Sequence, residues 1–148
     1  MIIEFMRERH IDEVTQIEED SFSIPWSRHD FERELVSRHA IYIVALEDNK
    51  VIGYAGMWHV VNEGHIVNIA VKEEKCRMGV GTLLIKRLID IAIEKEMIGL
   101  TLEVRMSNTA GQRLYHKFGF KAEGIRRRYY SDTGEDAIIM WKYFDNRD

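Results

Sequence analysis

The sequence contains one cysteine and one proline among 148 residues. The single cysteine, Cys76, excludes an internal disulfide framework, and the six histidines show no HExxH or paired-cysteine pattern that indicates zinc. No low-complexity segment or internal repeat occurs, and the only proline, Pro25, does not mark a linker. We therefore expect one continuous domain over residues 1–148 and no bound metal.

Long apolar runs and an excess of positive charge are also missing. No uncharged stretch approaches the roughly 18 residues of a membrane span, and the first ten residues carry charges where a secretory signal needs an apolar run. The formal net charge is −4, although Arg126, Arg127 and Arg128 form a local basic cluster. These features predict a cytoplasmic protein that binds neither a membrane nor nucleic acid directly. We also expect a monomer or weak dimer.

The sequence does contain a regular succession of short apolar patterns. Alternating patterns predict strands at residues 2–6, 41–47, 51–61, 65–71, 100–104, 120–130 and 136–144. Helical spacing predicts helices at residues 11–17, 28–35, 80–92 and 109–118, two of them capped by Ser27 and Asn108. This order predicts an α/β fold with a mixed, mostly antiparallel sheet of about six or seven strands and helices on both faces.

The segment CRMGVG, residues 76–81, joins an expected strand to the long expected helix. Bare backbone amides at a helix N-terminus, with the positive end of the helix dipole, form a site for phosphate. The segment lacks GxxxxGK[ST], and it lacks GxGxxG because Leu84 replaces the third glycine. From spacing alone, an ordinary helix start remains an equal alternative.

Several motifs together resemble one enzyme family. CRMGVG resembles the Q/R-x-x-G-x-G/A pyrophosphate loop of the GNAT acetyltransferases, although Cys76 stands where that family has Gln or Arg. Followed by LEVRMSN, LYHKFGF, RRRYY and EDAIIM, it resembles the RimI-like branch, the ribosomal-protein-alanine N-acetyltransferases, from about Glu18 to Met140. The resemblance implies a GNAT fold and transfer of acetyl from acetyl-CoA, the cosubstrate, to a protein N-terminus, above all the N-terminal alanine of a small-subunit ribosomal protein.

The resemblance also implies where the cosubstrate binds. Backbone amides of the glycine loop would hold the pyrophosphate: Arg77, Met78, Gly79, Val80, Gly81 and Thr82. Amides of Ile69, Ala70 and Val71 would donate to the thioester oxygen, at a place where family members splay two strands apart. Asn108 matches an asparagine that contacts the cosubstrate in relatives, and its position also suits a helix cap.

Two residues match the family's acid and base. Glu103 lies on the polar side of LTLEV and would accept the amine proton; since an ordinary Glu pKa near 4.3 makes a poor acceptor, we expect a raised pKa or a water relay. Tyr115 would protonate the departing thiolate. The alternatives are an outward polar residue and a packing tyrosine. Direct transfer in a ternary complex needs no acetyl group on Cys76.

The acceptor would lie between the segments SFSIPWS and RRRYYSDTGED, which flank the peptide groove in relatives. Pro25 and Trp26 would shape an apolar slot, and Tyr129 and Tyr130 would hydrogen-bond the peptide backbone. For Trp26, packing at a helix start is an equal alternative.

An acidic run precedes the first of these segments. Glu18, Glu19 and Asp20 would attract a basic protein, but such a run is more often a solvated face. Two other functions stay open: acetylation of a small-molecule amine or of a broader set of protein N-termini, and a non-catalytic acyl-CoA sensor. The sensor is disfavoured because binding alone requires neither Glu103 nor Tyr115.

Overall fold

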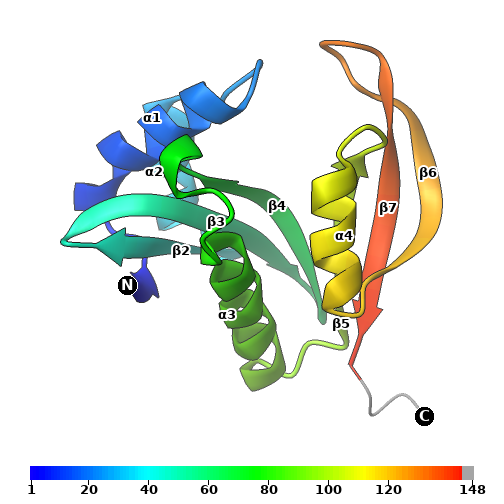
Figure 1. Ribbon diagram of the computed structural model, residues 1–148. Helices are drawn as coiled ribbons and strands as arrows, with labels where there is room; N and C mark the ends of the chain where they lie inside the picture. The colour runs from blue at the N-terminus through cyan, green and yellow to red at the C-terminus, as the bar shows by residue number, and fades with distance from the viewer. Residues whose placement is uncertain (145–148) are drawn as a thin grey trace.

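The computed structural model describes residues 1–144, which form one seven-stranded sheet and four α-helices (Figure 1). The strand order is β1-β2-β3-β4-β5-β7-β6. The strands are β1 (Ile2–Phe5), β2 (Ala40–Glu47), β3 (Lys50–Val60), β4 (Glu63–Val71), β5 (Gly99–Arg105), β6 (Lys121–Tyr130) and β7 (Glu135–Tyr143). The helices are α1 (Ile11–Ser21), α2 (Arg28–Val36), α3 (Val80–Glu94) and α4 (Thr109–Lys117). The expected mostly antiparallel α/β sheet is confirmed; residues 145–148 of the expected domain lie outside the described residues.

The sheet divides between β4 and β5, which form its one parallel pair within the described chain. Their pairing covers only three residue pairs and ends at His65 and Thr101. Beyond that point β4 continues to Val71 and β5 to Arg105, and Figure 1 shows the two strands diverging. We call this divergence the fork.

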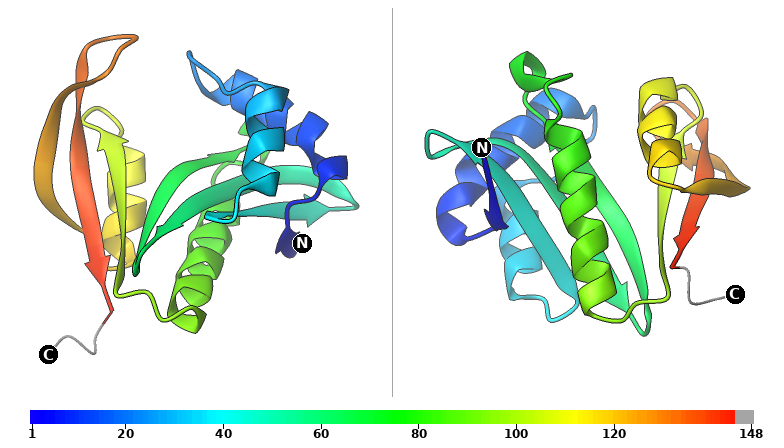
Figure 2. Two further views of the ribbon diagram at one scale, coloured as in Figure 1. Left: turned by 180° about the vertical axis from the view of Figure 1, so that it is seen from behind. Right: turned by 60° about the horizontal axis from the view of Figure 1, so that its bottom comes forward.

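Helices cover both faces of the sheet, as Figure 2 shows from two sides. On one face α3 buries the apolar side chains that the sequence placed at helical spacing, among them Leu84 and Leu88. On the other face α1 and α2 pack around Phe31, which is fully buried and meets Tyr42 and Tyr54 edge-on. The core under α1 and α2 packs against β2–β4, whereas the core under α3 extends across both halves of the sheet.

The predicted helix caps are confirmed. Ser27 Oγ accepts the Asp30 amide at 3.2 Å and the Asp30 carboxylate accepts the Ser27 amide at 2.9 Å, which is a reciprocal capping box. Asn108 Oδ1 accepts the Gly111 amide at 2.9 Å and so begins α4. Each cap ends a loop that borders the fork.

Neither a membrane-spanning helix nor a metal cluster is found in residues 1–144. None of the helices there is long and apolar enough to cross a membrane. Nor does this part of the chain bring three or more His, Cys, Asp or Glu side chains together as a metal site.

Candidate active site

The fork leaves backbone amides of β4 without a ladder partner. The Lys72 amide donates to Ile52 O on β3 at 2.8 Å, and residues two apart on a strand bond toward the same neighbour. The Ala70 amide therefore also points to β3, whereas those of Ile69 and Val71 point toward the side that β5 has left. The expectation that Ala70 donates into the site is corrected by this alternation.

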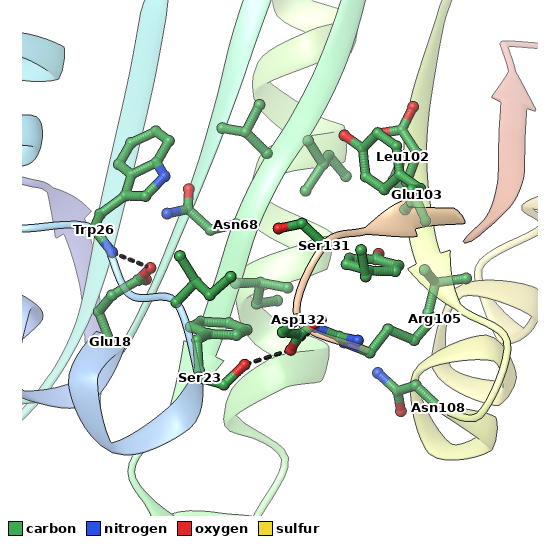
Figure 3. A pocket seen from close by; sticks show the side chains of 18 of the residues that line it. Glu18, Ser23, Trp26, Asn68, Leu102, Glu103, Arg105, Asn108, Ser131 and Asp132 are labelled. Carbon is green, nitrogen blue, oxygen red and sulfur yellow. Dashed lines mark hydrogen bonds and ion pairs between the residues drawn. The ribbon is translucent and has the colours of Figure 1, made fainter. Parts of the chain in front are cut away.

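The fork opens into a cleft of about 600 Å³. Figure 3 shows Glu18 and Trp26 on one wall and Glu103, Arg105 and Asn108 on the opposite wall. Further lining residues are Phe22, Ser23, Ile24, Ile66, Val67, Asn68, Ile69, Leu102, Val104, Tyr115, Tyr129, Tyr130, Ser131 and Asp132. The cleft thus brings together side chains from both halves of the sheet.

The loop before α3 presents unbonded amides to solvent. Its backbone takes positive φ at Arg77 (68°) and Gly79 (84°), and the helix has no side-chain cap. The first intrahelical bond there runs from the Leu83 amide to Gly79 O, at 3.1 Å. Within residues 1–144 the amides from Arg77 to Thr82 have no acceptor, so the loop meets the requirement for an anion site at a helix N-terminus.

Cys76 begins this loop and is exposed. Its Sγ lies 3.5 Å from Lys72 O and 3.8 Å from Val71 O, both weak contacts. The cysteine therefore sits between the free edge of β4 and the glycine loop, away from Glu103 on β5.

Glu103 is held by two basic side chains. His65 Nε2 lies 2.7 Å from Glu103 Oε1, and Arg126 Nε donates to Glu103 Oε2 at 3.0 Å, while the carboxylate is 8% exposed. The hydrogen bond to His65, more than the contact with Arg126, lowers the pKa of Glu103 and outweighs the opposing effect of burial. The expected raised pKa is therefore wrong, and a water relay stays as a prediction.

Tyr115 is the buried residue of α4, packed edge-on against Phe120 at 5.8 Å. It nevertheless lines the cleft, and its hydroxyl has no hydrogen-bond partner in residues 1–144. Burial raises the pKa of Tyr115, so the hydroxyl stays protonated at neutral pH. The packing interpretation and the cleft interpretation therefore both hold for this side chain.

The two acceptor-side loops meet across the cleft. Ser23 Oγ, in the loop between α1 and α2, donates to Asp132 Oδ2 in the turn between β6 and β7. Arg105 Nη2 donates to the same carboxylate at 2.8 Å and stacks over the Tyr130 ring at 4.0 Å. Burial raises the pKa of Tyr130 to about 12. These contacts fix one rim of the cleft.

The predicted acceptor residues divide between cleft and surface. Trp26, Tyr129 and Tyr130 line the cleft, whereas Pro25 is exposed and is not among its lining residues. Trp26 also packs against Phe31, with ring centroids 5.5 Å apart, so it is both an anchor and a wall. Tyr129 and Tyr130 meet edge-on at 5.1 Å.

Sequence reasoning missed His65 and the role of Arg126. His65 is one of the polar residues of a mainly apolar strand, and the His65–Thr101 register places it diagonally beside Glu103. Arg126 was noted only as part of a basic cluster. Both residues were visible in the sequence, but His65 lies 38 residues and Arg126 lies 23 residues from Glu103 in the chain, so the contacts could not be inferred.

A model of the Acetyltransferase (GNAT) family matches residues 11–120. The chain belongs to the GNAT acetyltransferase family. A protein of Bacillus subtilis (strain 168), with the provisional name ribosomal protein bS18-alanine N-acetyltransferase, is 43% identical to it over 137 residues, 92% of this chain and 91% of that one. The N-alpha-acetyltransferase of Sulfurisphaera tokodaii is 32% identical over 145 residues, 88% of this chain and 85% of that one.

A solved structure shares this architecture. The crystal structure of the ribosomal-protein-S18-alanine N-acetyltransferase from Escherichia coli has a TM-score of 0.87 at 31% identity, and the match covers 99% of this chain and 98% of that one. The acetyltransferase uses acetyl-CoA as its donor. Two groups of unbonded amides fit this cosubstrate: those of the glycine loop suit a pyrophosphate, and those of Ile69 and Val71 suit a carbonyl oxygen.

We predict that Arg126→Gln raises the pKa of Glu103, because the guanidinium favours the ionised carboxylate. The titration of the Glu103 carboxyl carbon, followed by NMR and assigned with Glu103→Gln, should move to higher pH in the acetyltransferase variant. Arg127→Gln is the control, since it removes an equal charge from an exposed neighbour that does not contact Glu103. An identical titration in both variants would contradict this account of the carboxylate.

Proposed function

We propose that this acetyltransferase acetylates the N-terminal α-amine of a protein, in the first place the N-terminal alanine of a ribosomal protein. The observation that carries the proposal is that Glu103, Tyr115 and the unpaired edge of β4 meet in one cleft. The names of the Bacillus subtilis and Escherichia coli relatives support the same acceptor. The reaction joins the acceptor nitrogen to the acetyl carbon and breaks the carbon–sulfur bond.

The first requirement is to remove a proton from the acceptor amine. An α-amine has a pKa of about 7.7 to 8.0, so a useful fraction is neutral near pH 7. Glu103 is kept ionised by His65 and Arg126 and is therefore a weak base on its own. We assign it a water relay: a water molecule oriented by the carboxylate takes the amine proton and passes one of its own protons to Glu103, while His65 fixes the carboxylate.

The second requirement is to stabilise charge on the carbonyl oxygen and on the departing sulfur. Acetyl-CoA supplies the acetyl group as a thioester. The amides of Ile69 and Val71 would donate hydrogen bonds to the oxygen as its negative charge develops. The Tyr115 hydroxyl, which has no other partner in the described chain, would donate to the sulfur and then transfer its proton.

A neighbouring function is acetylation of a broader set of protein N-termini. The name of the Sulfurisphaera tokodaii relative, an N-alpha-acetyltransferase, favours it. The same cleft and the same catalytic groups would serve this function, and only the breadth of accepted first residues would differ.

The proposal predicts that the enzyme labels a free peptide N-terminus. Labelled acetyl-CoA is offered with a synthetic peptide beginning Ala-Arg-Tyr and, separately, with the same peptide blocked at its N-terminus. Label should appear on the free peptide alone. Peptides with other first residues then show which N-terminal residues the enzyme accepts. Label on both peptides, or on neither while CoA binds, would overturn α-amine acetylation.

Tyr115→Phe is predicted to lower kcat by roughly 10² or more, because it removes the proton donor but keeps the ring that packs on Phe120. The affinity for acetyl-CoA should change little. Steady-state kinetics with calorimetric titration of CoA measures both quantities. An unchanged kcat would leave Tyr115 with its packing role only.

A further inference from the structure

Glu18 differs from the other acidic residues of its run. The side chains of Glu19 and Asp20 are exposed, whereas Glu18 is 3% exposed and lines the cleft from the last turn of α1. Its Oε2 accepts the Trp26 amide at 2.9 Å and its Oε1 accepts the Tyr54 hydroxyl. Figure 3 shows the contact with Trp26 on the cleft wall. The solvated-face interpretation therefore fails for this one residue.

Three carboxylates line the cleft, and two of them have cationic partners. Glu103 contacts Arg126 and His65, and Asp132 contacts Arg105. Within residues 1–144, Glu18 forms no ion pair; both of its contacts are neutral hydrogen-bond donors. Glu18 is thus the cleft carboxylate whose charge the described chain leaves uncompensated.

Among residues 1–144, no cation from the elements packed against α1 contacts Glu18; Arg28 of α2 does reach α1, but it pairs with Asp12 and Glu32 instead. Tyr54 on β3 donates to it, and burial together with the Glu18 charge raises the pKa of Tyr54, so that hydroxyl stays protonated. Tyr42 on β2 also faces it, bonded in turn to Glu34 of α2 and to Asn68 of β4. The surroundings are therefore neutral or negative.

Another neighbour of α1 is the short 3-10 turn Glu8–His10, at the opposite end of the helix. Its buried His10 accepts the Arg7 amide and lies near Glu4. About two helical turns separate His10 from Glu18.

A buried carboxylate without a counter-ion is costly, and two neutral hydrogen bonds offset only part of that cost. An acceptor that arrives as a primary amine below pH 8 carries a positive charge into the same cleft. We propose that Glu18 is the counter-ion that binds a cationic group of the acceptor, foremost its α-ammonium group, before deprotonation. This inference rests on the proposed function. Glu103 cannot take that role equally well, because the Arg126 guanidinium already compensates its charge and His65 already occupies its other oxygen.

Glu18→Gln tests the proposal, because glutamine keeps an acceptor for Trp26 and a polar partner for Tyr54 while it removes the charge. Charge-assisted hydrogen bonds contribute about 1.5–3 kcal/mol, so KM for the Ala-Arg-Tyr peptide should rise roughly tenfold or more. KM for acetyl-CoA should not change. Glu19→Gln, the same substitution on the exposed neighbour, is the matched control and should leave both constants unchanged.

Two further measurements identify which cationic group of the acceptor Glu18 binds. If it is the α-ammonium group, the ratio of variant to wild-type KM falls toward one between about pH 6.5 and pH 9.5, as the amine loses its charge. If it is a basic side chain, the ratio is independent of pH but falls toward one with a peptide beginning Ala-Ala-Tyr. Either result supports a cation site at Glu18.

A ratio that is raised equally at every pH and with both peptides would show that Glu18 only positions the Trp26 loop, and would overturn the inference. Equal KM values for wild type and Glu18→Gln would overturn it as well. A wild-type enzyme that acetylates neither peptide is a different failure, since it overturns the proposed function and this inference with it.

Discussion

The early end of the β4–β5 pairing is the constraint on which the site depends. Three residue pairs hold the two halves of the sheet together, and beyond them each strand is supported only by its outer neighbours. The amides of Ile69 and Val71 are unpaired for this reason alone. His65 is the last residue of β4 that pairs with β5, and Glu103 lies two residues beyond Thr101, its partner on β5, so the two side chains meet where the fork opens.

Charge is distributed unevenly within the cleft that the fork creates. On the wall formed by β5 and β6, the negative charge of Glu103 is compensated, since this carboxylate contacts Arg126 and His65. The wall formed by α1 carries the uncompensated Glu18, beside the apolar ring of Trp26. A small cationic N-terminus, the acceptor that we propose, would find both a negative wall and a carboxylate already compensated by Arg126, which suits an acceptor that must bind charged and react neutral.

Local patterns predicted most of the fold. Period-two spacing correctly separated Leu102 from Glu103, and the caps at Ser27 and Asn108 were read correctly because the partners of each cap lie within three residues. The fork could not be predicted from residues alone. The alternation of apolar and polar residues shows which face of the sheet each side chain occupies, but it does not show which strands pair or where their pairing ends. The predicted rise in the pKa of Glu103 was also wrong, because the direction of the shift depends on partners that are distant in sequence.

We propose above all that the edge of β4 stays open for the acetyl donor. Amide hydrogen exchange measured by NMR tests it directly, residue by residue. In the free protein the amides of Ile69 and Val71 should exchange fast, while that of Ala70, bonded to β3, is protected; acetyl-CoA should slow the first two and leave Ala70 unchanged. Protection of Ile69 and Val71 in the free protein, or fast exchange of both at saturating acetyl-CoA, would contradict the account.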